Sequence, residues 1–276
     1  MFEKLQHASR LNDNGSWPYL RTHPLTTERI ADMHSRVPQG KNQPPQPTLE
    51  HALMAGRARV LSRPGIDTLR QWVKLPDMPE FAQRNAREQA AALYVAVLSQ
   101  MELKDWRAAR ALWSRLDALV QPSGDKAGIQ QVQWLGAELE LEDKQPQAAL
   151  QLLGHADLRG DLPRPAMLLG SRALLALGQP AVVSDRLQTW VAVHPHDAAA
   201  WRLLAQAWYA QREDLRAIRA EAEARVAHYD YAGAVDRFKA AQDLAQRGQG
   251  DYIEASIIDT RLRAVQELLR EQTRQK

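Results

Sequence analysis

The sequence of 276 residues contains no cysteine, so the chain forms neither disulfide bonds nor metal sites with thiolate ligands. It also lacks any apolar run approaching the roughly 20 residues that a membrane-spanning helix needs. The N-terminus does not have the basic and then apolar layout of a signal peptide. Met1–Leu5 instead resembles the interior of a helix that began before Met1, and we expect the chain to be cut from a longer one.

The usual signatures of catalysis are missing as well. The sequence has no Gly-x-Gly-x-x-Gly or phosphate-binding loop, no Gly-x-Ser-x-Gly elbow and no His-Glu-x-x-His pair. Glu138, Glu140 and Glu142 are spread around one helix with no partner acid in view. We therefore predict that this chain by itself is not an enzyme and holds neither a cofactor nor a metal ion.

Charge and hydropathy are those of an ordinary solvated surface. The 36 Lys and Arg residues and 33 Asp and Glu residues give a net charge of +3, and the mean hydropathy is −0.48. Because the two signs are interleaved along the chain, we expect no nucleic-acid partner.

The stretch Trp201–Trp208 has the signature of the first helix of a tetratricopeptide (TPR) repeat, with an aromatic, Leu, a small residue and a second aromatic at set spacings. A small or β-branched residue recurs early in each second helix, at Ala109, Ala149, Val183 and Ala217, and the last two intervals are 34 residues. That period is the TPR repeat length. The sequence therefore predicts an all-α fold, a TPR-type solenoid of helix pairs.

The expected helices alternate along the repeat region. Their predicted ranges are Glu80–Glu102, Arg107–Val120, Gln130–Leu141, Gln147–Leu158, Pro165–Leu177, Ala181–His194, Ala198–Ala210, Leu215–His228 and Ala232–Gln246. Ala234 follows Ala217 by half a repeat, so Leu215–His228 is expected to serve two neighbouring repeats. Asp251–Arg274 is expected to cap the last apolar face.

Composition divides the chain into three parts. Residues 1–37 form a short helical segment that does not fit the repeat phase, and residues 38–47 are a linker with four prolines. Residues 48–276 form the predicted superhelical domain.

In such a stack the first helices line a concave groove, which is typically used to bind peptides or proteins. Aromatic and arginine side chains are enriched at binding hot spots. When positions in the other first helices are aligned with the helix that contains Trp201, nine residues are predicted to point into the groove: Tyr94, Met101, Trp134, Glu138, Arg172, Leu175, Arg202, Gln206 and Tyr209. For each aromatic among them, packing between helices is the alternative interpretation.

The N-terminal segment carries a resemblance to a known family. Thr22–Asp32 resembles the end of the peptidase domain of His-Glu-x-x-His zinc metalloproteases, in which a Thr-His-Pro segment precedes Arg-Ile-Ala. Met1–Ser9 resembles the helix before it. Asp197–Ala207 and the tail Arg261–Lys276 are similar to the C-terminal part of the BepA-like periplasmic metalloproteases of Gram-negative bacteria.

The resemblance implies a full-length zinc endopeptidase with chaperone-like activity in the periplasm, whose signal peptide and zinc-bearing domain lie upstream of Met1. This chain would then be the tail of the peptidase domain followed by the TPR region. The implied partners are the outer-membrane β-barrel assembly machinery and unfolded barrel substrates, with the chain peripheral to the membrane at most.

His23 matches a family histidine in a loop that can reach the catalytic zinc and hold the protease inactive. A neutral imidazole at the open zinc position would displace the water nucleophile. The alternative is a loop residue restrained by Pro24. Because the zinc ligands are not in this chain, His23 is expected to bind no metal here.

Three functional hypotheses remain open at this point. The first is a protein-interaction module of a BepA-like protease, and the second is an enzyme to which this chain contributes a regulatory loop. The third is a free-standing TPR adaptor or scaffold without a protease link, which leaves the peptidase-like segment unexplained.

Overall fold

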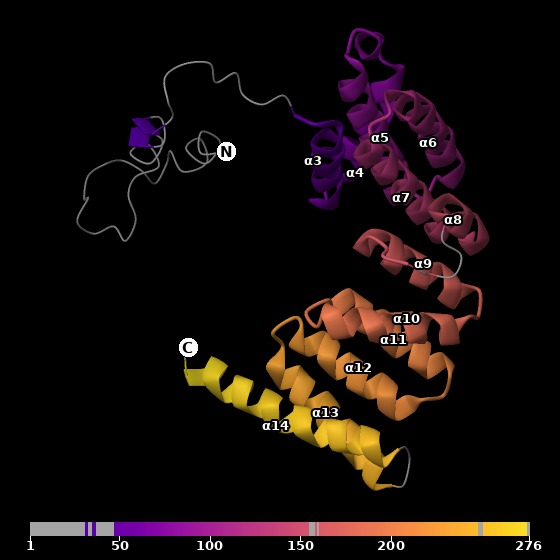
Figure 1. Cartoon of the computed structure of the whole chain (residues 1–276). Coiled ribbons are helices and arrows are strands. Elements are labelled where there is room, and N and C mark those ends of the chain that lie inside the picture. The colour runs from indigo at the N-terminus through magenta and orange to yellow at the C-terminus, as the bar shows by residue number, and fades with distance from the viewer. Residues whose placement is uncertain are drawn as a thin grey trace. The chain divides into compact units, whose positions relative to one another are not determined.

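The computed structural model describes residues 31–32, 35–36, 47–154, 158, 160–247 and 251–274. The unit from Thr48 to Lys276 is compact by itself, and its described residues form twelve α-helices without a β-strand (Figure 1). The prediction of an all-α helical solenoid is confirmed. The segments assigned above to residues 1–37 and to the linker lie almost wholly outside the described residues.

The helices follow one another with short connections. They are α3 (Leu49–Leu61), α4 (Ile66–Lys74), α5 (Ala86–Glu102), α6 (Trp106–Val120), α7 (Lys126–Glu142), α8 (Pro146–Leu153), α9 (Arg164–Ala176), α10 (Pro180–Val193), α11 (Ala198–Ala210), α12 (Asp214–Val226), α13 (Tyr231–Gln246) and α14 (Tyr252–Arg274).

Side-chain caps fix where several helices begin. The Asn85 side chain accepts a hydrogen bond from the Glu88 backbone N–H and the Glu88 side chain accepts one from the Asn85 N–H, so α5 begins at Ala86 and not at Glu80 as predicted. The Asp125 carboxylate likewise accepts from the Gly128 N–H, which starts α7 four residues before the predicted position.

Helix α8 ends earlier than the sequence suggests. Gly154 adopts a left-handed backbone conformation with φ of 67°, which terminates the helix at Leu153. Leu158, expected to end this helix, lies outside it with its side chain fully buried against Gly170 of α9. A residue with a side chain at position 170 would occupy the space that Leu158 fills.

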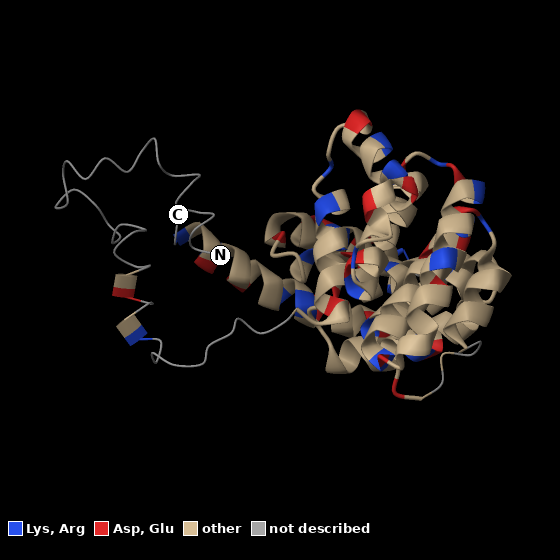
Figure 2. Ribbon diagram, turned by 90° about the horizontal axis from the view of Figure 1, so that it is seen from above, with Lys and Arg blue, Asp and Glu red and all other residues tan. Residues whose placement is uncertain are grey.

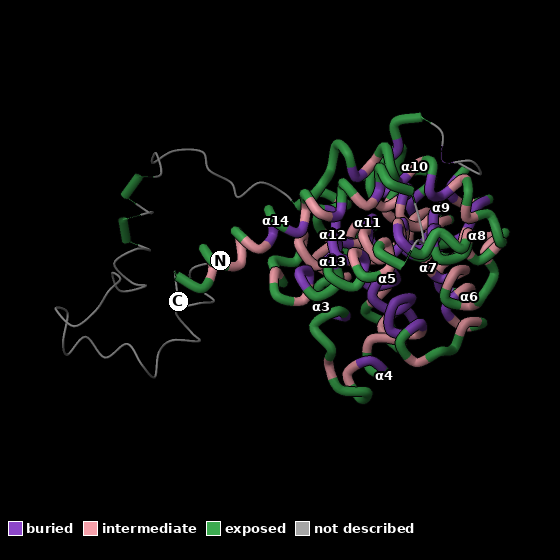
Figure 3. The backbone as a smooth tube through the Cα atoms, turned by 90° about the horizontal axis from the view of Figure 1, so that it is seen from below, coloured by how far each residue is buried: buried purple, intermediate pink, exposed green. Residues whose placement is uncertain are grey.

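Each helix from α5 to α14 packs against the next one along the chain, and α5, α7, α9 and α11 also contact one another in series. This second set of contacts makes these four helices one continuous row. Buried positions recur on the helix faces that meet, and exposed positions recur on the faces that point outward (Figure 3).

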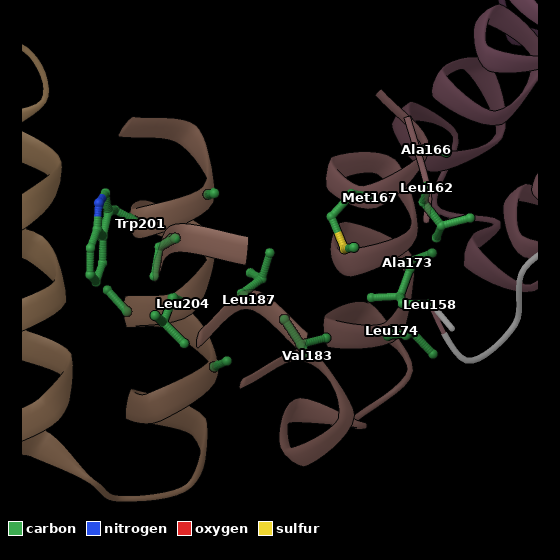
Figure 4. Packing of buried hydrophobic residues seen from close by; sticks show 14 of the residues in the cluster. Leu158, Leu162, Ala166, Met167, Ala173, Leu174, Val183, Leu187, Trp201 and Leu204 are labelled. Carbon is green, nitrogen blue, oxygen red and sulfur yellow. The ribbon is translucent and has the colours of Figure 1, made fainter. Parts of the chain in front are cut away.

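Three clusters of buried apolar side chains run along the stack. The central cluster includes Leu187 and Val183 of α10, which lie between Leu204 of α11 and Leu174 of α9 (Figure 4). A second cluster joins α3 to α7, and a third joins α12 to α14.

Helix α12 belongs to two of these clusters. Ala217, Ala220 and Ala224 face the central cluster, whereas Leu215 and Ala222 face the cluster shared with α13 and α14. The helix therefore has two apolar faces, as the half-repeat spacing predicts.

Ion pairs fasten the last helix to the stack. Arg261 of α14 donates to both carboxylate oxygens of the buried Glu223 on α12, at 2.6 and 2.8 Å. Arg219 of α12 pairs with the buried Glu254 of α14. Across the described ribbon the two charge signs are interspersed (Figure 2), and none of the described helices is long and apolar enough to cross a membrane.

Candidate functional site

A cavity of about 700 Å³ lies along the row formed by α7, α9 and α11. Its lining residues are Met54 and Arg57 of α3, Tyr94 of α5, Gln131, Trp134, Leu135 and Glu138 of α7, Arg164, Pro165, Leu168, Leu169 and Arg172 of α9, and Ala199, Arg202, Leu203 and Gln206 of α11. On each of α7 and α11 the lining residues recur every three or four positions, so one face of each helix supplies them. A volume of this size is ample for several side chains of a bound peptide.

One wall of the cavity is apolar. Trp134, Leu168, Leu169 and Leu203 pack against the central cluster, and each remains only partly buried. Their buried sides hold them in place, and their other sides offer apolar surface to an incoming side chain. Such a wall favours a ligand with a large apolar group.

Helix α3 closes one end of the cavity. Arg57 donates from Nη1 and Nη2 to the two carboxylate oxygens of Glu138 on α7, at 2.7 and 2.8 Å. The Arg57 Nη1 also lies 3.4 Å from the Tyr94 hydroxyl. Burial of Arg57 opposes its charge, but Glu138 outweighs this effect and raises the Arg57 pKa.

Tyr94 is almost entirely enclosed at this end. Its side chain is 1% exposed, and burial raises the pKa of its hydroxyl. Tyr94 therefore presents little surface to a ligand, and its ring belongs to the cluster that joins α3 to α7.

Two further arginines on α9 are held by carboxylates. Arg164 donates from Nε and Nη2 to the buried Asp197, at 2.8 Å for each contact. Asp197 also accepts from the Trp190 indole N–H and from the Ala200 N–H at the start of α11. Arg172 donates to Glu142 at the end of α7, at 2.7 Å.

The cavity brings together six of the nine residues that the repeat phase directed into a groove. They are Tyr94, Trp134, Glu138, Arg172, Arg202 and Gln206. Whether these residues bind a partner stays a prediction.

Met101, Leu175 and Tyr209 are not among the lining residues, in contrast to the expectation. Met101 is buried in the cluster that joins α3 to α7, and Leu175 packs against the central cluster. Tyr209 is 40% exposed at the end of α11, where burial and the neighbouring Glu221 raise its pKa. All three lie toward the C-terminal ends of their helices, beyond the span of the cavity.

The sequence pattern did not indicate that α3 lines the cavity, nor that Leu168 and Leu169 of α9 do. Met54 and Arg57 precede the first recognised helix pair, so the repeat phase could not place them. Leu168 and Leu169 lie four and three residues before Arg172, which the sequence did predict for the groove. This spacing on α9 could have marked them as members of the same helix face.

His23 lies outside the described residues, so its predicted regulatory role stays a prediction. Within the described ranges, no group of three or more His, Asp or Glu side chains is placed to hold a metal ion. These residues therefore do not fit a zinc site, and no chemical step is assigned to them.

The chain was compared with known protein families and with individual proteins. No family model matches the chain. The chain is similar to β-barrel assembly-enhancing proteases. It shares 28% identity over 204 residues with the protein of that name from Yersinia pestis, which covers 73% of this chain and 40% of the relative. It shares 29% identity over 217 residues with the protein of that name from Escherichia coli K12, which covers 77% of this chain and 42% of the relative.

The chain thus spans about two fifths of the length of the relatives it matches. The similarity supports the BepA-like relationship expected from the sequence. Most of each relative has no counterpart in the aligned part of this chain.

Proposed function

We propose that this chain is the partner-binding region of a larger β-barrel assembly-enhancing protease, and that it holds a segment of a partner protein in the cavity along α7, α9 and α11. The observation that carries the proposal is the cavity itself. An apolar wall around Trp134 and Leu203 stands beside the side chain of Arg202, and all three residues belong to helices, Trp134 to α7 and the other two to α11. This combination of residues suits peptide recognition.

The similarity to β-barrel assembly-enhancing proteases supports the choice of partner. In this proposal the bound segments come from the outer-membrane β-barrel assembly machinery or from unfolded barrel proteins, and the protein works in the periplasm. Residues 48–276 bind the partner as a TPR-like domain. Residues 1–37 complete a peptidase domain that lies upstream, and residues 38–47 link the two.

The full-length protein is proposed to be a zinc endopeptidase, with the zinc bound outside this chain and with His23 restraining the activity. This part has its own test. His23→Ala in the full-length protein is expected to raise proteolysis of a barrel substrate, and unchanged proteolysis would remove the regulatory role of His23.

The partner-binding proposal is tested by photo-crosslinking in Gram-negative cells. A photoreactive amino acid is placed at Trp134 or Arg202 in the cavity, and at the exposed Asp185 of α10 as a control position. We expect crosslinks to barrel-assembly components or barrel proteins from the two cavity positions and not from position 185. Crosslinks only to cytosolic proteins would favour the free-standing adaptor and contradict the proposal.

A further inference from the structure

The cavity has an uneven balance of charge. Four of its lining residues are arginines, Arg57, Arg164, Arg172 and Arg202, whereas Glu138 is its single lining carboxylate. The first three arginines are each held by a carboxylate, namely Glu138, Asp197 and Glu142. Among the described residues, no carboxylate lies within 4.0 Å of Arg202.

The position of Arg202 explains why it stays unpaired. It is exposed on α11, between Ala199 and Gln206 on the face that lines the cavity. The carboxylate nearest in sequence, Asp197, caps α11 and is already engaged by Arg164, Trp190 and the Ala200 N–H. The guanidinium group of Arg202 therefore keeps its donors available for a ligand.

The surroundings of Arg202 make an anionic ligand group more favourable than on an open surface. Leu203 is its neighbour on α11, and Trp134 and Leu168 line the same cavity. A carboxylate brought into this cavity loses part of its water, and its hydrogen bonds to a guanidinium group are stronger there. The planar fork of arginine also matches the two oxygens of a carboxylate.

The same observations disfavour a nucleic acid. Binding to a phosphate backbone relies on several free cations, and three of the four arginines in this cavity are already neutralised. The apolar wall has no role in phosphate binding, but it fits a large apolar side chain. Charge and apolar surface together fit an acidic, apolar peptide.

Building on the proposed function, we propose that the cavity selects protein segments in which an Asp or Glu side chain stands beside a large apolar side chain. Arg202 binds the carboxylate, and Trp134, Leu168 and Leu203 receive the apolar group. Arg57, Arg164 and Arg172 shape the cavity through their ion pairs and do not bind the ligand carboxylate.

A displayed library of random 12-residue peptides provides the probe. The peptides are fused at their C-termini, so that side chains are the only carboxylates they offer, and they are selected on the intact 276-residue chain. Enriched peptides are expected to contain Asp or Glu beside Trp, Phe or Leu more often than the input library. Each enriched peptide is then synthesised with capped ends, together with a twin in which Asp or Glu is replaced by Asn or Gln.

The acidic peptide is expected to bind roughly tenfold more tightly than its amide twin, since a charge-assisted pair is lost in the twin. Arg202→Gln should abolish this difference without changing the affinity for the twin. Gln206→Glu should reduce the difference too, because the new carboxylate stands one turn from Arg202 on α11 and pairs with it. Arg263→Gln, at an exposed arginine of α14 outside the cavity, is the matched control and should keep the difference.

Equal binding of the acidic peptides and their amide twins would overturn the acidic preference, and it would leave the partner-binding proposal standing if binding still requires Trp134. Selection of neutral or basic peptides would have the same consequence. If no enriched peptide loses affinity in Trp134→Ala, the partner-binding proposal itself fails.

Discussion

Arg57 on α3 and Glu138 on α7 form a paired set of hydrogen bonds, with Nη1–Oε2 and Nη2–Oε1 distances of 2.7 and 2.8 Å. The two residues are 81 positions apart in the sequence, and their side chains are 28% and 24% exposed. This ion pair joins α3 to the row of helices that lines the cavity. It also engages both carboxylate oxygens of Glu138.

Removing one partner of this ion pair should destabilise the chain. In Arg57→Met the carboxylate of Glu138 stays partly buried without its donors, and we expect a loss of about 1–3 kcal/mol in the free energy of unfolding. Urea unfolding of Arg57→Met, Glu138→Leu and the double variant measures the coupling. The double variant should lose less free energy of unfolding than the two single variants lose together. If its loss equals the sum of the two single losses, the two side chains do not interact.

The buried Asp197 should make stability depend on acid pH. Burial by itself would raise the pKa of Asp197, but hydrogen bonds from Arg164, Trp190 and the Ala200 N–H outweigh it and lower the pKa. A carboxyl group with a lowered pKa in the folded state stabilises the fold above its unfolded pKa of about 3.9, and this contribution is lost as the pH falls through the folded pKa.

Asp197→Asn is therefore expected to be less stable than the parent chain at pH 7, and the difference should shrink below about pH 4. Melting temperatures of both proteins between neutral and strongly acidic pH provide the measurement. A difference that stays constant across this range would mean that the carboxylate of Asp197 has the same pKa in the folded and unfolded chain.

Gly136 on α7 lies so close to the Trp113 ring of α6 that a larger residue at this position would collide with the ring. A Cβ atom built at position 136 would lie 2.6 Å from the Trp113 ring, and the Trp113 indole N–H donates to the Val132 carbonyl oxygen at 2.8 Å. Alanine favours helices over glycine by about 1 kcal/mol, yet Gly136→Ala should destabilise the chain by about 1–3 kcal/mol because the ring has to move.

The second variant for this test is Trp113→Leu, alone and combined with Gly136→Ala. Once the ring is gone, Gly136→Ala should become neutral or stabilising in urea unfolding. If Gly136→Ala stays destabilising in the Trp113→Leu background, steric conflict with the ring is not the cause.

Local sequence signals predicted much of the fold. Most of the predicted helix ranges agree with the observed helices to within a few residues, and the 34-residue interval indicated how the helices alternate. The errors arose where a cap or a left-handed residue decides a boundary, as at Asn85 and Gly154.

The candidate site was less accessible from the sequence. The repeat phase placed Trp134 and Arg202 on the row that lines the cavity, but it could not show that α3 closes one end or that Arg57 neutralises Glu138. Such contacts depend on how helices distant in sequence pack together, and periodicity within one helix does not record this. The unpaired state of Arg202 emerges only after every neighbouring ion pair is known.

The most direct test measures by thermophoresis how tightly the chain binds an outer-membrane β-barrel protein. The barrel protein is first unfolded in urea, and the urea is then diluted. Trp134→Ala is compared with Trp106→Ala, since both variants remove a partly buried indole and Trp134 alone of the two lines the cavity. The proposed function predicts that Kd rises about tenfold or more for Trp134→Ala and stays unchanged for Trp106→Ala. Equal affinities for the parent chain and both variants would contradict the assignment of this cavity as the partner-binding site.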